Sequence, residues 1–120
     1  MQKRIAILDD DQDILNLFYS VLSPEYSVYI TNSSSDFIDY IDKNGLDLLI
    51  IDLLMPDIDG FDIISHLRKS NDLTPVIIVS GINKADSRIE SIHHAKICLQ
   101  KPVDPEELLI AVENTVGVKI

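Results

Sequence analysis

The sequence predicts an α/β fold, a parallel sheet of five strands covered by five helices. Apolar runs and amphipathic stretches alternate five times along the 120 residues. The connections between them are short, which favours right-handed crossovers and a doubly wound sheet. Most of the predicted strands are also apolar throughout, as strands covered on both faces usually are. The pattern alone leaves the order of the strands open.

The first, third and fourth predicted strands are almost wholly apolar. The second mixes Tyr and Ser with Val and Ile, which is typical of a strand at the edge of a sheet. The predicted strands cover residues 3–8, 26–30, 47–52, 75–80 and 97–100.

The predicted helices place apolar residues on one face. The second ends at Asn44 and Gly45, a pair typical of a helix C-terminus. The last begins with Asp104 as N-cap and Pro105 at the first helical position. The predicted helices cover residues 12–22, 34–44, 60–70, 84–94 and 104–116, and the fourth has the weakest apolar face.

The composition predicts one domain over residues 1–120, with no second domain in this chain. No apolar run approaches the ~20 residues of a membrane span, and the first residues lead directly into a strand rather than a signal peptide. A single Cys excludes an internal disulfide. We therefore expect a cytoplasmic protein without a membrane segment.

The formal net charge is −10, from 20 acidic and 10 basic residues. Because phosphate contacts need clustered Lys and Arg, this charge disfavours direct binding of DNA or RNA. Part of the acidity belongs to a candidate site, and we expect the rest to lie on solvated helix faces.

Polar residues stand at the C-terminal ends of four predicted strands. Asp9 and Asp10 follow the first strand, and Asp52 ends the third. Ser80 ends the fourth strand, and Lys101 follows the fifth. If the strands are parallel neighbours, these side chains meet at one edge of the sheet, where open α/β sheets place their sites.

A cluster of three carboxylates with one lysine is unstable unless a proton or a cation joins it. Two like charges about 4 Å apart repel by roughly 4 kcal/mol at an effective dielectric constant near 20. Mg²⁺ prefers oxygen ligands and commonly uses one or two carboxylates together with a phosphate. The lack of His and Cys at these positions argues against zinc. The sequence therefore predicts a site for a divalent cation and a phosphoryl group.

The chain resembles the response-regulator receiver domains of two-component signalling over essentially its whole length. Each motif alone is a weak signal, but all four in this order and at these spacings are a strong one. The motifs are ILDDD at residues 7–11, IDLLMPDIDG at 51–60, PVIIVSG at 75–81 and LQKP at 99–102. The resemblance implies the flavodoxin-like strand order 2-1-3-4-5, which brings Asp10 near Asp52.

The resemblance also implies the roles of the residues that would carry the chemistry. Asp52 would be the phosphoacceptor, its carboxylate attacking phosphorus to form an acyl phosphate. Lys101 would stabilise the phosphoryl oxygens, and Ser80 would donate its hydroxyl to one of them. The Lys101–Pro102 peptide bond is expected to be cis.

The cofactor implied by the resemblance is Mg²⁺. Asp9 and Asp10 would hold it together with Asp52, and Asp10 more directly than Asp9. The backbone carbonyl of Leu54 would be a further ligand. Asp11 is not expected to be a ligand, because an acidic residue at the start of a helix explains it.

The implied function is a signalling switch rather than an enzyme, with catalysis limited to phosphorylation and dephosphorylation of Asp52. The phosphoryl donor would be a histidine kinase or a phosphotransfer protein, because no His of this chain is suitably placed. The modified form would favour one of two pre-existing states and so change its binding to an output domain or effector protein. Homodimerisation would use the last helix–strand–helix face.

One position departs from the family pattern, and two others are expected to affect the rate of dephosphorylation. Cys98 stands where receivers commonly have Tyr or Phe, so an aromatic switch at this position is excluded. Leu54 and Ile82 flank the expected phosphoryl position, and apolar side chains there cannot orient a hydrolytic water. We therefore expect slow self-dephosphorylation.

Three alternative functions remain. A small Mg²⁺-dependent phosphatase with an aspartyl-phosphate intermediate would usually have a second Asp where this chain has Leu54. A degenerate receiver would act only as an interaction module, although all five site residues are present. A flavodoxin-like cofactor carrier is disfavoured because the Asp residues at 9–11 would repel a flavin phosphate.

Overall fold

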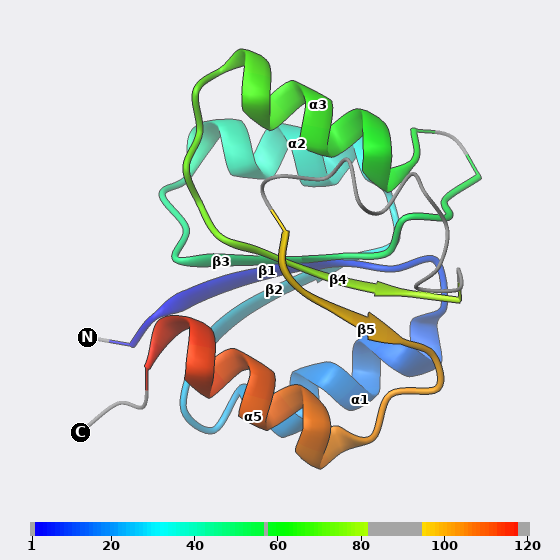
Figure 1. The fold of residues 1–120 in the computed structure, drawn as a ribbon, viewed down its shortest axis with the longest axis vertical. Helices are drawn as coiled ribbons and strands as arrows, with labels where there is room; N and C mark the ends of the chain where they lie inside the picture. Colours follow the sequence, from blue (N-terminus) through cyan, green and yellow to red (C-terminus); the bar gives the residue numbers. More distant parts are fainter. Residues whose placement is uncertain (1, 57, 82–94, 118–120) are drawn as a thin grey trace.

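The computed structural model of the chain describes residues 2–56, 58–81 and 95–117. Five parallel strands form one sheet in the order β2-β1-β3-β4-β5. Helices α2 and α3 lie on one face of this sheet, and α1 and α5 lie on the other (Figure 1). The predicted doubly wound sheet and its 2-1-3-4-5 order are therefore confirmed. The strands are β1 (Arg4–Leu8), β2 (Ser27–Thr31), β3 (Leu48–Ile51), β4 (Val76–Ser80) and β5 (Ala95–Gln100).

The described part of the chain contains four helices. The fourth predicted helix, over residues 84–94, lies outside the described residues. Within the described ranges, no helix combines the length and the hydrophobicity that crossing a bilayer requires. The helices are α1 (Gln12–Leu22), α2 (Ser34–Lys43), α3 (Gly60–Lys69) and α5 (Pro105–Val116).

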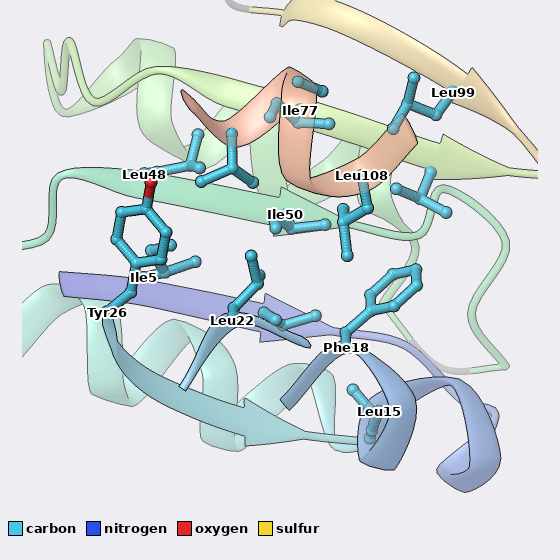
Figure 2. Close-up of a cluster of buried hydrophobic side chains, with 14 residues drawn as sticks. Ile5, Leu15, Phe18, Leu22, Tyr26, Leu48, Ile50, Ile77, Leu99 and Leu108 are labelled. Atoms are coloured by element: carbon cyan, nitrogen blue, oxygen red, sulfur yellow. The ribbon is translucent and has the colours of Figure 1, made fainter. Parts of the chain in front are cut away.

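The sheet separates two apolar clusters because successive side chains of a strand point to opposite faces. In β1, Ile5 and Ile7 pack under α1 and α5, whereas Ala6 and Leu8 pack under α2 and α3. Figure 2 shows the α1/α5 cluster, with Phe18 pointing from α1 toward the strands. Because β1, β3 and β4 are buried along their whole length or nearly so, the positions of their C-terminal ends are fixed from both sides.

The helices next to the C-terminal edge of the sheet begin with capping side chains. Asp11, Ser33, Asp59 and Asp104 are N-caps, and each accepts a backbone N–H of the first helical turn. Such a cap typically contributes about 1 kcal/mol. The predicted cap at Asp104 and the predicted helix start at Asp11 are confirmed.

Helix α2 ends close to where the sequence predicts, but its C-terminus is capped by a side chain and not by a left-handed glycine. Asn44 is extended, and its side-chain Nδ2 donates to the Tyr40 carbonyl at 2.9 Å. Among the described glycines only Gly117 has a positive φ, so Gly45 does not form the left-handed cap that the Asn–Gly pair predicts. The amide side chain supplies the donor that such a cap would otherwise provide.

Gly60 is the position where the start of α3 comes closest to the end of β3. Its N–H donates to the Leu53 carbonyl at 2.9 Å. A Cβ at Gly60 would lie 2.7 Å from the Leu53 Cα and 2.8 Å from the Asp52 carbonyl oxygen. Both neighbours are backbone atoms, so any side chain here must displace the segment that carries Asp52.

We predict that Gly60→Ala lowers the free energy of unfolding by about 1–3 kcal/mol, because the backbone must move to admit a methyl group. Gly45→Ala is the matched control, since a Cβ at Gly45 meets no atom within 4 Å. Urea denaturation measures both variants. Equal stability of the two variants would contradict the close approach at Gly60.

Candidate functional site

Three carboxylates meet at the C-terminal edge of the sheet. Asp9 and Asp10 follow β1, and Asp52 follows the neighbouring strand β3. One carboxylate oxygen from each residue lies within 4.8 Å of the other two. Asp9 and Asp52 are 1% and 3% exposed, whereas Asp10 is exposed. The edge therefore combines two buried carboxylates with one that faces solvent.

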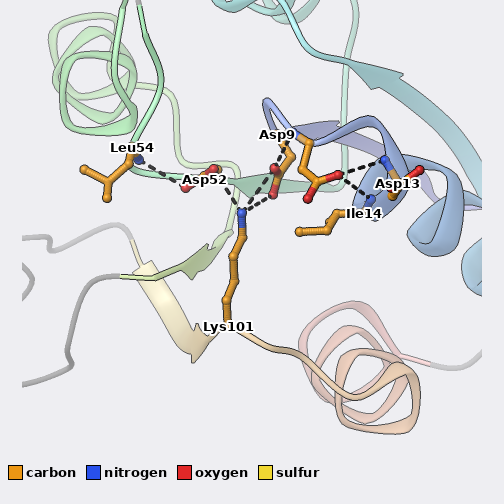
Figure 3. A network of polar contacts seen from close by, with 7 residues as sticks. Asp9, Asp13, Ile14, Asp52, Leu54 and Lys101 are labelled. Carbon is orange, nitrogen blue, oxygen red and sulfur yellow. Dashed lines mark hydrogen bonds and ion pairs between the residues drawn. The ribbon is translucent and has the colours of Figure 1, made fainter.

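Lys101 reaches these carboxylates from the end of β5. Its Nζ lies 3.0 Å from Asp9 Oδ2 and 3.2 Å from Asp9 Oδ1. The same Nζ lies 3.2 Å from Asp52 Oδ2. Figure 3 shows the ammonium group between the two buried carboxylates. Lys101 thus pairs with both Asp9 and Asp52.

Backbone N–H groups provide the remaining contacts of the buried carboxylates. Asp9 Oδ1 accepts the Asp11 N–H at 2.9 Å, and Asp52 Oδ1 accepts the Leu54 N–H at 3.1 Å (Figure 3). Within the described residues, the Leu54 N–H thus contacts one oxygen of Asp52 and Lys101 contacts the other. These contacts fix the orientation of both buried side chains.

The pKa values of the three groups reflect burial and their mutual charges. Burial, and to a smaller extent the charge of Asp9, raise the pKa of Asp52 to about 6, against the opposing effects of the Leu54 N–H and Lys101. Burial also raises the pKa of Asp9. Burial alone would lower the pKa of Lys101, but its hydrogen bond with Asp9 and the charges of both carboxylates raise it. The lysine therefore stays cationic at neutral pH.

Ser80 is the last residue of β4 and is fully buried. Its backbone carbonyl accepts the Lys101 N–H at 2.9 Å, so it lies directly beside the lysine. The Lys101–Pro102 bond is cis, as the sequence resemblance implies. Leu54 is 51% exposed next to the carboxylates, and Ile82 lies outside the described residues.

Two further residues clarify the surroundings of the site. Cys98 on β5 is half-buried and packs against the apolar cluster under α2 and α3, as expected for a core thiol. Ser34, which sequence reasoning did not single out, donates its hydroxyl to the Ile58 carbonyl at 2.6 Å. The only sequence signal was the run of three serines at the start of α2.

The donor set at this edge fits a hard divalent cation. The cluster offers only carboxylate oxygens, with no nitrogen or sulfur ligand in the group. Mg²⁺ binds through oxygen ligands and keeps several waters, which the exposure of Asp10 permits. The chemistry of the residues therefore suits Mg²⁺ rather than zinc.

Comparison with known proteins identifies the family. The profile of the response regulator receiver domain matches residues 5–113. The transcriptional regulatory protein YbdJ of Bacillus subtilis is 33% identical over 112 residues, covering 92% of this chain and 49% of the relative. The regulatory protein VanRc of Enterococcus gallinarum is 30% identical over 116 residues, covering 95% and 50%. The chain spans about half the length of these relatives.

Solved structures agree with this assignment. A CheY-like receiver domain protein from Methanospirillum hungatei superposes with a TM-score of 0.88 at 27% identity, covering 97% of this chain and 94% of that chain. The chain therefore belongs to the receiver domain family of two-component response regulators. Receiver domains are signalling switches that typically bind Mg²⁺ at an acidic pocket, as the sequence resemblance indicated.

The raised pKa of Asp52 predicts a pH-dependent stability of the metal-free protein. An unfolded Asp has a pKa of about 3.9, whereas that of folded Asp52 is about 6. Below pH 4 the group is protonated in both states. Between about pH 4 and 6 the unfolded state loses its proton first, so the free energy of unfolding falls as pH rises. At pH 7 we expect Asp52→Asn to be more stable by about 1–3 kcal/mol.

Urea denaturation in EDTA from pH 4 to 7 measures this difference. Asp39→Asn is the control, because this carboxylate lies on the exposed face of α2, and we expect little change there. A stability difference between Asp52→Asn and the unmodified protein that does not grow with pH would contradict the assigned burial cost.

Proposed function

We propose that this receiver domain accepts a phosphoryl group on Asp52 from a histidine kinase or phosphotransfer protein in a Mg²⁺-dependent reaction. The observation that carries the proposal is the Lys101 ammonium between the carboxylates of Asp9 and Asp52, at 3.0 and 3.2 Å. This arrangement puts a fixed positive charge beside a buried carboxylate nucleophile. It also leaves the Asp10 carboxylate open to solvent.

In the proposed reaction an oxygen of Asp52 attacks the phosphorus of a phosphohistidine. The new bond joins this oxygen to phosphorus, and the bond from phosphorus to the donor's imidazole nitrogen breaks. The electron pair of the broken bond stays on that nitrogen. The Lys101 ammonium, already within 3.2 Å of Asp52 Oδ2, offsets the charge on the phosphoryl oxygens.

Asp10 and Asp52 are the residues we propose to hold Mg²⁺, with Asp9 supporting them and the Leu54 carbonyl as a further ligand. When bound, the ion neutralises the charge of the phosphoryl oxygens and orients the group for in-line transfer. Asp9 is the less direct ligand in this assignment, because both of its oxygens already contact Lys101.

We further propose that phosphorylation acts as a switch through Lys101 and Ser80. The modified Asp52 carries close to two negative charges on its phosphoryl group in place of the single charge of the carboxylate, so the lysine gains a stronger partner than Asp9. The buried Ser80, beside the lysine, supplies a hydroxyl for a phosphoryl oxygen. The resulting shift between two states changes the surface offered to an output domain or effector protein, without an aromatic ring at Cys98.

Incubation with acetyl phosphate or phosphoramidate and Mg²⁺ tests the acceptor. We predict that intact mass spectrometry detects one added phosphoryl group, because Asp52 is the one of the two buried carboxylates beside Lys101 that the receiver resemblance makes the phosphoacceptor. Asp52→Asn and excess EDTA should each abolish the addition, whereas Asp39→Asn on the far surface should retain it. Phosphorylation that persists in Asp52→Asn would assign the acceptor elsewhere.

The exposed Leu54 predicts slow loss of the phosphoryl group, because an apolar side chain cannot orient an attacking water. We expect Leu54→Asn and Leu54→Glu to speed dephosphorylation by roughly threefold or more. Mass spectrometry of the phosphorylated protein over time measures the rate. Leu73→Asn is the control, since Leu73 is also apolar and 86% exposed but follows α3. An unchanged rate in both Leu54 variants would refute this assignment.

A further inference from the structure

Ser34 makes a polar contact that neither the carboxylate cluster nor helix capping explains. It is the first residue of α2 and is 4% exposed. The capping role at this helix belongs to Ser33, whose side chain accepts the Asp36 N–H. The Ser34 hydroxyl instead donates to the backbone carbonyl of Ile58 at 2.6 Å. A buried hydroxyl on one helix thus binds the backbone of a distant segment.

Ile58 belongs to the β3–α3 loop, defined here as the described residues 52–56 and 58–59 between β3 and α3. This loop begins with Asp52 and carries Leu54. Its ends are held by the Leu54 N–H on Asp52 Oδ1 at 3.1 Å and by the Gly60 N–H on the Leu53 carbonyl at 2.9 Å. The Ser34 contact is an additional tie, and it comes from outside the β3–loop–α3 segment.

We propose that Ser34 is a positioning residue that holds the β3–α3 loop in its place beside the carboxylate cluster. The inference rests on the proposed function, because the loop supplies both Asp52 and the Leu54 carbonyl. Loss of the hydroxyl would leave the Ile58 carbonyl without this donor and free the loop to sample other positions. The Leu54 peptide would then be less often placed for the ion.

The protein contains a natural control for this contact. Asp42 and His66 join α2 to α3 rather than to the loop, with 2.9 Å between Asp42 Oδ1 and His66 Nε2. Both side chains are at least a third exposed, and neither belongs to the β3–α3 loop. Asp42→Asn therefore weakens a contact between α2 and α3 without releasing the loop.

The test uses nuclear magnetic resonance on the ¹⁵N-labelled protein. Amide exchange of Leu54 and Gly60 in EDTA reports opening of the loop, and a Mg²⁺ titration reports the affinity of the site. We expect Ser34→Ala to speed exchange of both amides and to weaken Mg²⁺ binding, each by about threefold to tenfold. Asp42→Asn should change neither.

Ser34→Thr and Ser34→Val separate the hydroxyl from packing, because the two side chains have nearly the same shape. The threonine variant should approach the unmodified protein, and the valine variant should resemble Ser34→Ala. A general loss of stability would affect both alike.

Unchanged loop exchange and Mg²⁺ affinity in Ser34→Ala would overturn the proposal, and so would equal behaviour of the Thr and Val variants. If the hydroxyl controls exchange and Mg²⁺ affinity but the unmodified protein takes no phosphoryl group from acetyl phosphate, the proposed function fails while the role of Ser34 stands.

Discussion

The ammonium group of Lys101 between two nearly buried carboxylates is the constraint on which the site depends. Without it, Asp9 and Asp52 would be like charges in a region almost closed to water, where repulsion at about 4 Å reaches roughly 4 kcal/mol. The lysine contacts both at 3.0–3.2 Å. Even so, burial keeps the pKa of each carboxyl raised. The cluster thus remains short of positive charge, which explains why a divalent cation suits it.

The site residues come together because the strands that precede them end at the same edge of the sheet, and not because they are close in the sequence. Strands β1 and β3 are neighbours, so Asp10 and Asp52 lie side by side although more than 40 residues separate them. Lys101 directly follows β5, and β4 lies between β5 and β3 in the sheet. The long side chain of Lys101 nevertheless reaches the carboxylates of Asp9 and Asp52 (Figure 3). The apolar clusters on the two faces hold the strands in this register.

Most strands and helix starts, and the carboxylate cluster, could be predicted from the sequence because local patterns of residues indicate them. Strands covered on both faces appear as short apolar runs, and Asp11 and Asp104 mark helix starts because their side chains cap exposed N–H groups. The carboxylate cluster followed from strand ends sharing an edge. The strand order came from the family resemblance, because several orders satisfy the same alternation of elements.

Side-chain contacts between residues far apart in the sequence could not be predicted from it. The sequence indicates that Lys101 approaches Asp52 but not that it also engages both oxygens of Asp9. The run of three serines at the start of α2 does not reveal that Ser34 contacts Ile58, which lies 24 residues away. Helical periodicity alone does not predict which apolar residues are buried. Leu17 fits the apolar spacing of α1, yet its side chain is 41% exposed. Tertiary packing decides such cases.

The most direct test of the central claim is a crystal structure of the protein with Mg²⁺ and beryllofluoride, which imitates a phosphoryl group on a carboxylate. The account predicts beryllofluoride on Asp52, with the Lys101 Nζ within hydrogen-bonding distance of a fluorine and the ion on Asp10 and Asp52. Beryllofluoride on another carboxylate, or a Lys101 side chain turned away from it, would contradict the account.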